Sequence, residues 1–174
     1  GKFMDGGHHW TDRGAGNEPP AGTNIIKLSD GQAVALAGAE GTVVRYNREK
    51  NDKEWKFSPV SLAAEFKGYD LDKAGNPTFR SAGEGVALSD AWAPVAGAKP
   101  SLTRTLKATG EKPLVVTLAR DLAVTGPADG AYELAGGLLV RSVSGPALQA
   151  DAAAKTITLT LKPGETAVLG YSFR

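Results

Sequence analysis

The two histidines of the chain stand next to each other, at His8 and His9, and Asp12 follows three residues later. Imidazole nitrogens and carboxylate oxygens are common ligands of first-row transition metals. Neighbouring residues of a strand point to opposite faces, so both histidines bind one ion only where the backbone is irregular. Two interpretations follow. One is a metal site made by His8, His9 and Asp12. The other, which we prefer, is an arm whose polar side chains hydrogen-bond to a sheet beneath it.

A second group of candidates consists of aromatic side chains that would suit a sugar ring. A carbohydrate site needs a flat apolar platform and a few directed polar groups. Trp10 and Trp92 stand in glycine-rich or turn-like surroundings, which favours exposure, and Tyr69 and Asp12 add a ring and a carboxylate. The sequence therefore gives Trp10, Trp92, Tyr69 and Asp12 as candidate binding residues. The alternative is that these aromatic side chains pack in the core or along strand edges.

Acidic residues raise the question of glycoside chemistry, which needs two carboxylates facing each other at roughly 5 Å or 6.5–9.5 Å. Acids that would be available for such a pair are Glu54, Glu65, Asp70, Asp72, Glu84 and Asp90. The sequence alone places no two of them across a cleft. The chain also lacks the serine nucleophile motif Gly-x-Ser-x-Gly and a phosphate-binding loop. The sequence therefore identifies no catalytic residue.

Residues 70–76, Asp-Leu-Asp-Lys-Ala-Gly-Asn, have the look of the first half of a calcium loop. Ala74 stands where such a loop needs a third side-chain oxygen, and Ser81 stands where it needs a bidentate glutamate. Aspartate, glycine and asparagine also favour hairpin turns, because they tolerate left-handed backbone angles. We therefore predict a turn between two strands here.

Composition removes several classes of function. The chain has 174 residues, no cysteine, and 20 basic against 19 acidic residues, for a net charge of +1. The lack of cysteine excludes disulfides, thiolate metal sites, iron–sulfur clusters and thiol catalysis, and we expect no cofactor in this chain. The near-neutral charge argues against nucleic acid as a partner. No apolar stretch approaches the roughly 18 residues that a membrane-spanning helix needs, so we expect no membrane span.

The elements that must position these side chains begin after a distinct N-terminal segment. Residues 1–23 are rich in glycine and proline, which interrupt helices. We expect them to form an extended arm that packs on the domain. The chain starts at Gly1 without the pattern of a signal peptide, and we interpret it as a fragment or a processed chain.

From residue 24 onward, short runs with the pattern of strands are separated by turn residues. These runs cover residues 32–37, 42–46, 65–72, 77–82, 85–90, 101–108, 113–120 and 138–144. We expect hairpins at residues 38–41, 73–76 and 109–112, and one or two helical turns at residues 58–65.

The clearest alternation lies at the C-terminal end. In residues 155–161 apolar side chains alternate with threonine, and after the turn at 162–165 every second residue is again apolar. These apolar residues are Ile157, Leu159, Leu161, Ala167, Leu169, Tyr171 and Phe173. We predict that these two strands form an antiparallel pair with one wet face. About ten to twelve short strands without a βαβ pattern predict an all-β fold, an antiparallel, jelly-roll-like β-sandwich that makes residues 24–174 one domain.

Three strings of the sequence resemble a β-sandwich module of large exported bacterial proteins. They are Gly-Lys-Phe-Met-Asp-Gly-Gly and Thr-Asp-Arg-Gly-Ala-Gly near the N-terminus, and Phe-Lys-Gly-Tyr-Asp-Leu-Asp-Lys-Ala-Gly-Asn-Pro-Thr-Phe at residues 66–79. In those proteins the module resembles a spacer or accessory domain beside a sugar-dehydrogenase-like β-propeller and a c-type cytochrome domain. The resemblance implies a periplasmic or extracellular location and places any electron chemistry in neighbouring domains.

Two functions follow as expectations. The first is a non-catalytic accessory or scaffold domain of a larger exported protein, whose partners are neighbouring domains and, through weak binding, carbohydrate. The alternative is a small β-sandwich polysaccharide hydrolase or lyase that uses a carboxylate pair.

Overall fold

The computed structural model describes residues 34–36, 64–83, 85–97, 99 and 101–174, and every regular element among them is a strand. The all-β prediction is confirmed. The strands are β1 (Val34–Leu36), β2 (Glu65–Leu71), β3 (Pro77–Gly83), β4 (Val86–Val95), β5 (Ser101–Gly110), β6 (Leu114–Arg120), β7 (Val124–Ala128), β8 (Ala131–Leu134), β9 (Leu138–Ser144), β10 (Gln149–Asp151), β11 (Thr156–Leu161) and β12 (Thr166–Phe173). The described residues contain no helix long and apolar enough to cross a bilayer.

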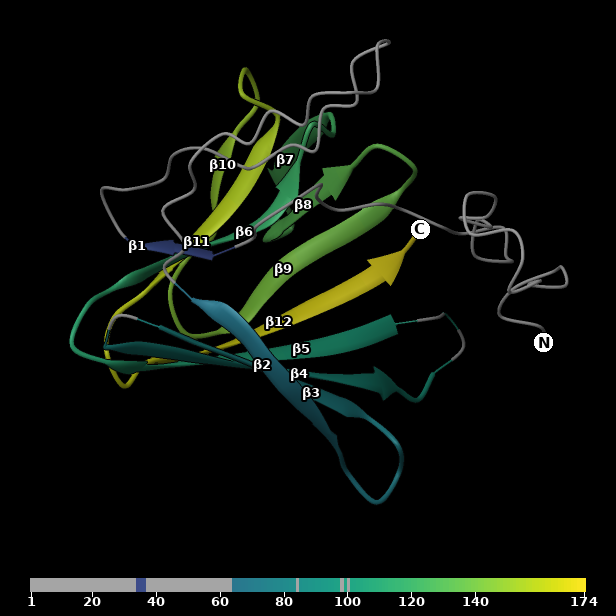
Figure 1. Ribbon diagram of the computed structural model, residues 1–174. Helices are drawn as coiled ribbons and strands as arrows, with labels where there is room; N and C mark the ends of the chain where they lie inside the picture. The colour runs from purple at the N-terminus through teal and green to yellow at the C-terminus, as the bar shows by residue number, and fades with distance from the viewer. Residues whose placement is uncertain (1–33, 37–63, 84, 98, 100) are drawn as a thin grey trace, which may run out of the picture.

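The strands form two antiparallel sheets that face each other as a β-sandwich (Figure 1). Among the described residues, the large sheet has eight strands in the order β2-β3-β4-β5-β12-β9-β8-β7, and the small sheet has four in the order β1-β6-β11-β10. In Figure 1 the β7–β8–β9 end of the large sheet curves up beside the small sheet. The opposite end, β2–β3, extends away from it as a long hairpin.

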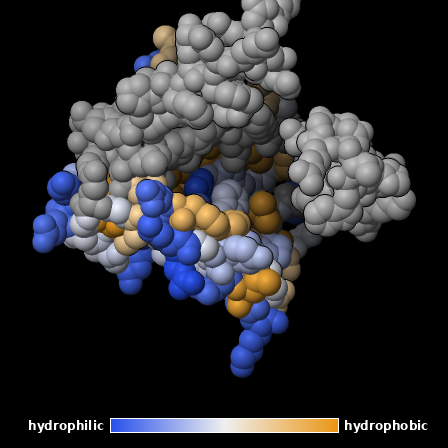
Figure 2. Space-filling view, viewed as in Figure 1, coloured by the Kyte–Doolittle hydropathy of each residue, from blue (hydrophilic) through white to orange (hydrophobic). Residues whose placement is uncertain are grey.

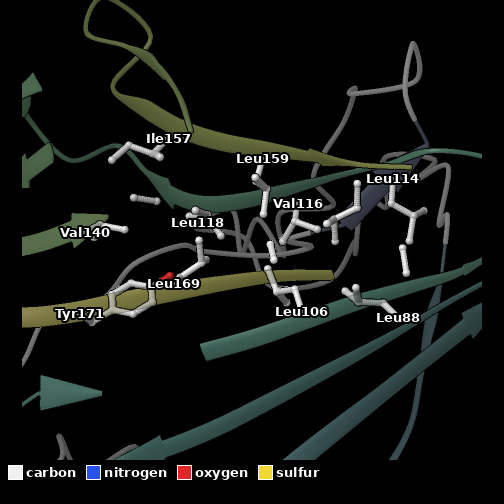
Figure 3. Close-up of a cluster of buried hydrophobic side chains, with 14 of the residues drawn as sticks. Leu88, Leu106, Leu114, Val116, Leu118, Val140, Ile157, Leu159, Leu169 and Tyr171 are labelled. Atoms are coloured by element: carbon white, nitrogen blue, oxygen red, sulfur yellow. The ribbon is translucent and has the colours of Figure 1, made fainter. Parts of the chain in front are cut away.

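The core lies between the sheets, where side chains of β6 and β11 meet those of β5, β9 and β12 (Figure 3). Leu114, Leu159 and Leu161 of the small sheet are fully buried, as are Leu106 and Leu169 of the large sheet. Burying a side chain of this size stabilises the fold by about 1.5–3 kcal/mol. These buried residues identify the face of the large sheet that packs against the small sheet, which we call the inner face.

The C-terminal alternation has the predicted buried residues but a different pairing. Ile157, Leu159 and Leu161 of β11, and Ala167, Leu169 and Tyr171 of β12, are all buried, whereas Phe173 is only partly buried. The predicted hydrogen-bonded pair between these strands is wrong, because β11 pairs with β6 and β10, whereas β12 pairs with β5 and β9. The turn between them crosses from one sheet to the other, and the two strands meet side chain to side chain across the core.

The hairpin predicted at residues 109–112 is wrong for the same reason. β5 pairs with β4 and β12 in the large sheet, and β6 pairs with β1 and β11 in the small sheet. All residues from Leu114 to Ala119 are buried, so β6 lacks the solvent-exposed face that a two-stranded hairpin would leave. The link between β5 and β6 therefore carries the chain between layers.

The turn predicted at residues 73–76 is confirmed between β2 and β3. The Asp72 carboxylate accepts hydrogen bonds from the backbone nitrogens of Ala74 and Asn76, and from the Asn76 side-chain nitrogen, each at 2.8 Å. These bonds lower the pKa of the Asp72 carboxyl, the bonds from Asn76 most strongly. Asp72 thus closes its own hairpin.

The remaining sequence predictions about architecture concern the N-terminal third. The run at residues 32–37 contains β1, which pairs with β6. The arm over residues 1–23, the strand at 42–46 and the hairpin at 38–41 lie outside the described residues, as do residues 58–63 of the predicted helical turns. The end of that helical prediction is wrong, because Glu65 begins β2.

Candidate functional site

Strand register brings several aromatic and charged side chains onto the inner face of the large sheet. Tyr69 of β2 lies opposite Phe79 of β3, Phe79 lies opposite Asp90 of β4, and Asp90 lies opposite the core residue Leu106. Residues directly opposite each other in an antiparallel pair share a face of the sheet. Tyr69, Phe79 and Asp90 therefore all lie on the inner face.

The β2–β3 end of this face carries an exposed apolar surface, which we call the aromatic patch: Phe66, Tyr69, Leu71 and Phe79. Their exposed fractions are 64%, 57%, 59% and 38%. The rings of Tyr69 and Phe79 lie 6.1 Å apart between centroids, with their planes inclined by 51°. In Figure 2 hydrophobic side chains interrupt the hydrophilic surface over this hairpin. Exposed apolar side chains gathered on one face make this patch a candidate site of interaction.

An irregularity in β2 puts Phe66 and Tyr69 on one face although they are three residues apart. In a regular strand, side chains at positions i and i+3 point to opposite faces. The register between β2 and β3 shifts between Phe66 and Gly68, as in a β-bulge. Gly68 has φ of +119°, a conformation that glycine adopts without strain. The bulge therefore assembles the patch.

Beside the patch, a cluster of polar and aromatic side chains surrounds the guanidinium of Arg104. Arg104 Nε and Nη2 donate to the two carboxylate oxygens of Asp90, at 2.9 and 2.7 Å, and Nη1 donates to the Tyr171 hydroxyl at 3.4 Å. Its Cζ atom lies 4.8 Å from the centroid of the Trp92 ring. The Trp92 and Tyr171 rings are in contact, with centroids 5.4 Å apart. We call these four residues the Arg104 cluster.

The cluster keeps its cation charged in a buried place. Arg104 is only 7% exposed. Burial acts to lower the pKa of Arg104, but the hydrogen bonds and charge of Asp90, together with Tyr171, more than offset burial and raise this pKa. Burial also raises the pKa of the Tyr171 hydroxyl above its ordinary value, although Arg104 opposes the shift. The cluster therefore holds one ion pair and one neutral phenol at physiological pH.

The raised pKa of Tyr171 predicts an alkaline loss of stability. The unfolded chain ionises this phenol near pH 10, whereas the folded chain resists ionisation. The resulting stabilisation is fully present below pH 10 and is lost as the pH rises through the folded pKa. We expect the free energy of unfolding of the wild type to fall more steeply above pH 10 than that of Tyr171→Phe, as measured by urea unfolding between about pH 8 and 11.5. Parallel curves for the two proteins would contradict the expectation.

The structure places two of the candidate binding residues on the same sheet face. Tyr69 belongs to the exposed patch. The turn-like surroundings expected for Trp92 are wrong, because Trp92 lies inside β4 and is half-buried against Arg104 and Tyr171. Trp10 and Asp12, as well as the candidate metal ligands His8 and His9, lie outside the described residues. In the part of the chain that the structure describes, no group of three or more histidine, aspartate or glutamate side chains is placed to hold a metal ion.

The acidic candidates that the structure describes each have a local partner. Glu65 pairs with Lys67 at 2.8 Å, which lowers the Glu65 pKa. Asp70 pairs with Arg80 at 3.0 Å, and Asp72 binds its own turn. Asp70 and Asp90 point to opposite faces of the sheet, because Asp70 directly follows Tyr69 in β2. Glu54 and Glu84 lie outside the described residues.

Sequence reasoning missed Phe66, Leu71 and Phe79 as members of the aromatic patch, and Arg104 and Tyr171 as members of the Arg104 cluster. A signal existed for Phe79, since the predicted hairpin already places it opposite Tyr69. No local pattern marks Arg104 and Tyr171, which are 67 positions apart in the chain.

Comparisons of this chain with protein-family models, with curated proteins and with solved structures find no match.

Proposed function

We propose that this chain is a non-catalytic accessory domain of a larger exported protein, and that its aromatic patch binds carbohydrate. The observation that carries the binding role is the exposed pair Tyr69 and Phe79, which shares the inner face of the large sheet with Asp90 and Trp92. The exported, multidomain setting rests on the resemblance of residues 66–79 and the N-terminal strings to accessory modules.

The chemistry of the face supports a sugar ligand. Aromatic rings offer flat apolar surfaces for the C–H faces of a sugar ring, while a few polar groups fix its orientation. Each carboxylate oxygen of Asp90 accepts one hydrogen bond from Arg104. An ionised carboxylate has about four acceptor sites, so Asp90 retains capacity for sugar hydroxyl donors. The Asp90 side chain is 17% exposed, which leaves an edge of it accessible.

The alternative hydrolase or lyase has less support. It needs two carboxylates facing one cleft. Of the acids described, Asp90 is paired with Arg104 on the inner face, and Asp70 is paired with Arg80 on the outer face. We therefore prefer binding to catalysis.

Removing either exposed ring of the patch is expected to weaken binding at least tenfold. Stacking one ring on a sugar buries apolar area worth about 1.5 kcal/mol or more, and 1.4 kcal/mol corresponds to a factor of ten in Kd. Calorimetric titrations of the whole chain with neutral hexasaccharides of glucose, xylose and mannose would compare the wild type with Tyr69→Ala and Phe79→Ala.

Val143→Ala provides a matched control for these variants. Val143 on β9 is 59% exposed, much as Tyr69 is, and is not part of the patch. We expect its truncation to leave Kd unchanged. The carbohydrate role would be rejected if no oligosaccharide bound at millimolar concentration, or if the two patch variants bound as tightly as Val143→Ala.

A further inference from the structure

A pocket of about 540 Å³ lies where the ends of four strands of the large sheet come together. Pro94 and Val95 end β4, and Leu102, the second residue of β5, pairs with Pro94. Leu138 begins β9 and Phe173 ends β12. The volume falls within the range of roughly 300–1,000 Å³ that is typical of small-molecule sites. The size and placement of this pocket suit a ligand of that class.

One wall of the pocket is built from the core of the sandwich. Leu138 and Tyr171 are 6% and 4% exposed, and Phe173 packs against the same core cluster. The other side is open to solvent, since Val95 and Leu102 are 46% and 42% exposed. A ligand would therefore rest its apolar part on a rigid wall and keep one end near water.

The charged group at this pocket is Lys99, in the link between β4 and β5. Its ammonium forms no ion pair with any residue that the structure describes, and none of the described residues that line the pocket is an aspartate or glutamate. An apolar wall beside Lys99, the one cation among the described lining residues, is complementary to a ligand with an apolar body and one negative charge.

We propose that this pocket binds a small amphipathic carboxylate, with its apolar chain against Leu102, Leu138 and Phe173 and its carboxylate near Lys99. The apolar contact supplies most of the affinity, because an exposed ion pair contributes little in water. The pocket and the aromatic patch share no residue, so this proposal stands independently of the carbohydrate role.

The test uses decanoate as the probe and decan-1-ol as its uncharged counterpart, each titrated against the whole chain with displacement of a fluorescent anilinonaphthalene sulfonate. We expect one saturable site. Leu102→Trp, which fills the pocket, should weaken decanoate binding at least tenfold. Lys99→Glu should weaken decanoate about fivefold and leave decanol unchanged, because it reverses the charge without closing the pocket.

Lys107→Glu is the matched control for the charge reversal. Lys107 lies on β5, the strand that follows Lys99, and is exposed but does not line the pocket. Circular dichroism would show whether each variant is folded. If Leu102→Trp fails to fold, Lys99→Glu still tests the proposal, because the affinity for decanoate should fall relative to the affinity for decanol. The proposal is overturned by the absence of saturable decanoate binding, by equal effects of Lys99→Glu and Lys107→Glu, or by a loss of binding in Tyr69→Ala, which would locate the probe on the aromatic patch.

Discussion

Replacing Asp90 with alanine is expected to lower the free energy of unfolding by about 3 kcal/mol. The side chains of Arg104 and Asp90 are 8% and 17% exposed and are joined by two hydrogen bonds. Removing one partner of a buried ion pair leaves the other charge without compensation, which costs about 3–5 kcal/mol. Because Asp90 retains an accessible edge, we expect the lower end of this range. Urea unfolding followed by far-ultraviolet circular dichroism measures the loss.

The same sheet contains a matched control in the pair formed by Asp70 and Arg80. Their separation is 3.0 Å, but their side chains are 60% and 55% exposed. An exposed ion pair contributes at most about 1 kcal/mol, so Asp70→Ala should change stability by less than that. Equal effects of Asp90→Ala and Asp70→Ala would show that burial does not set the strength of the Arg104 pair.

A double variant separates the cost of a lone charge from the value of the pair itself. In Asp90→Leu with Arg104→Met, both charges are replaced by apolar side chains of similar size. Replacing a buried ion pair in this way is often neutral for stability. We therefore expect the double variant to regain most of the stability lost in Asp90→Ala. Failure to regain it would mean that the contact of Arg104 with Trp92 and Tyr171 contributes substantially to stability.

Alternation in the sequence predicts which side chains are buried but not which strands are hydrogen-bonded. In β11 and β12 six of the seven predicted inward residues are buried and Phe173 is partly buried, yet the strands belong to different sheets. A hairpin and a turn that crosses between two layers present the same pattern, because in both each strand buries every second side chain. The choice depends on the rest of the fold. The backbone of the turn at residues 162–165 bonds to Ala108 of β5, which lies far earlier in the chain.

The candidate site likewise has a part that local sequence predicts and a part that depends on contacts between distant strands. The hairpin of β2 and β3 is a local feature, and the sequence places Tyr69 opposite Phe79 within it. The bulge that adds Phe66 depends on a single register shift, which a two-residue period does not show. The Arg104 cluster joins strands from across the chain, since Tyr171 reaches Arg104 only when β12 inserts between β5 and β9.

The close pairing of β4 with β5, which aligns Trp92 with Arg104, depends on a glycine at the end of the ladder. Gly110 lies opposite Val86, with φ of +119°. A Cβ atom at Gly110 would collide with the carbonyl oxygen of Gly85 and lie 2.8 Å from the Cα atom of Val86. Both neighbours are backbone atoms, so no side chain can rotate away. The only relief is to separate β4 from β5 at this end.

We expect Gly110→Ala to lower the free energy of unfolding by about 3–5 kcal/mol, the sum of backbone strain and overpacking. Gly68→Ala isolates the strain, because Gly68 has the same φ of +119° but a Cβ atom there would meet no heavy atom within 4 Å. It should cost only about 1–2 kcal/mol. Since the two glycines have the same φ, a difference of about 1–4 kcal/mol between the two variants in urea unfolding reports mainly the steric contact at Gly110. Equal losses would mean that β4 and β5 tolerate separation at Gly110, and the alignment of Trp92 with Arg104 would then have to be maintained by the core side chains beyond it.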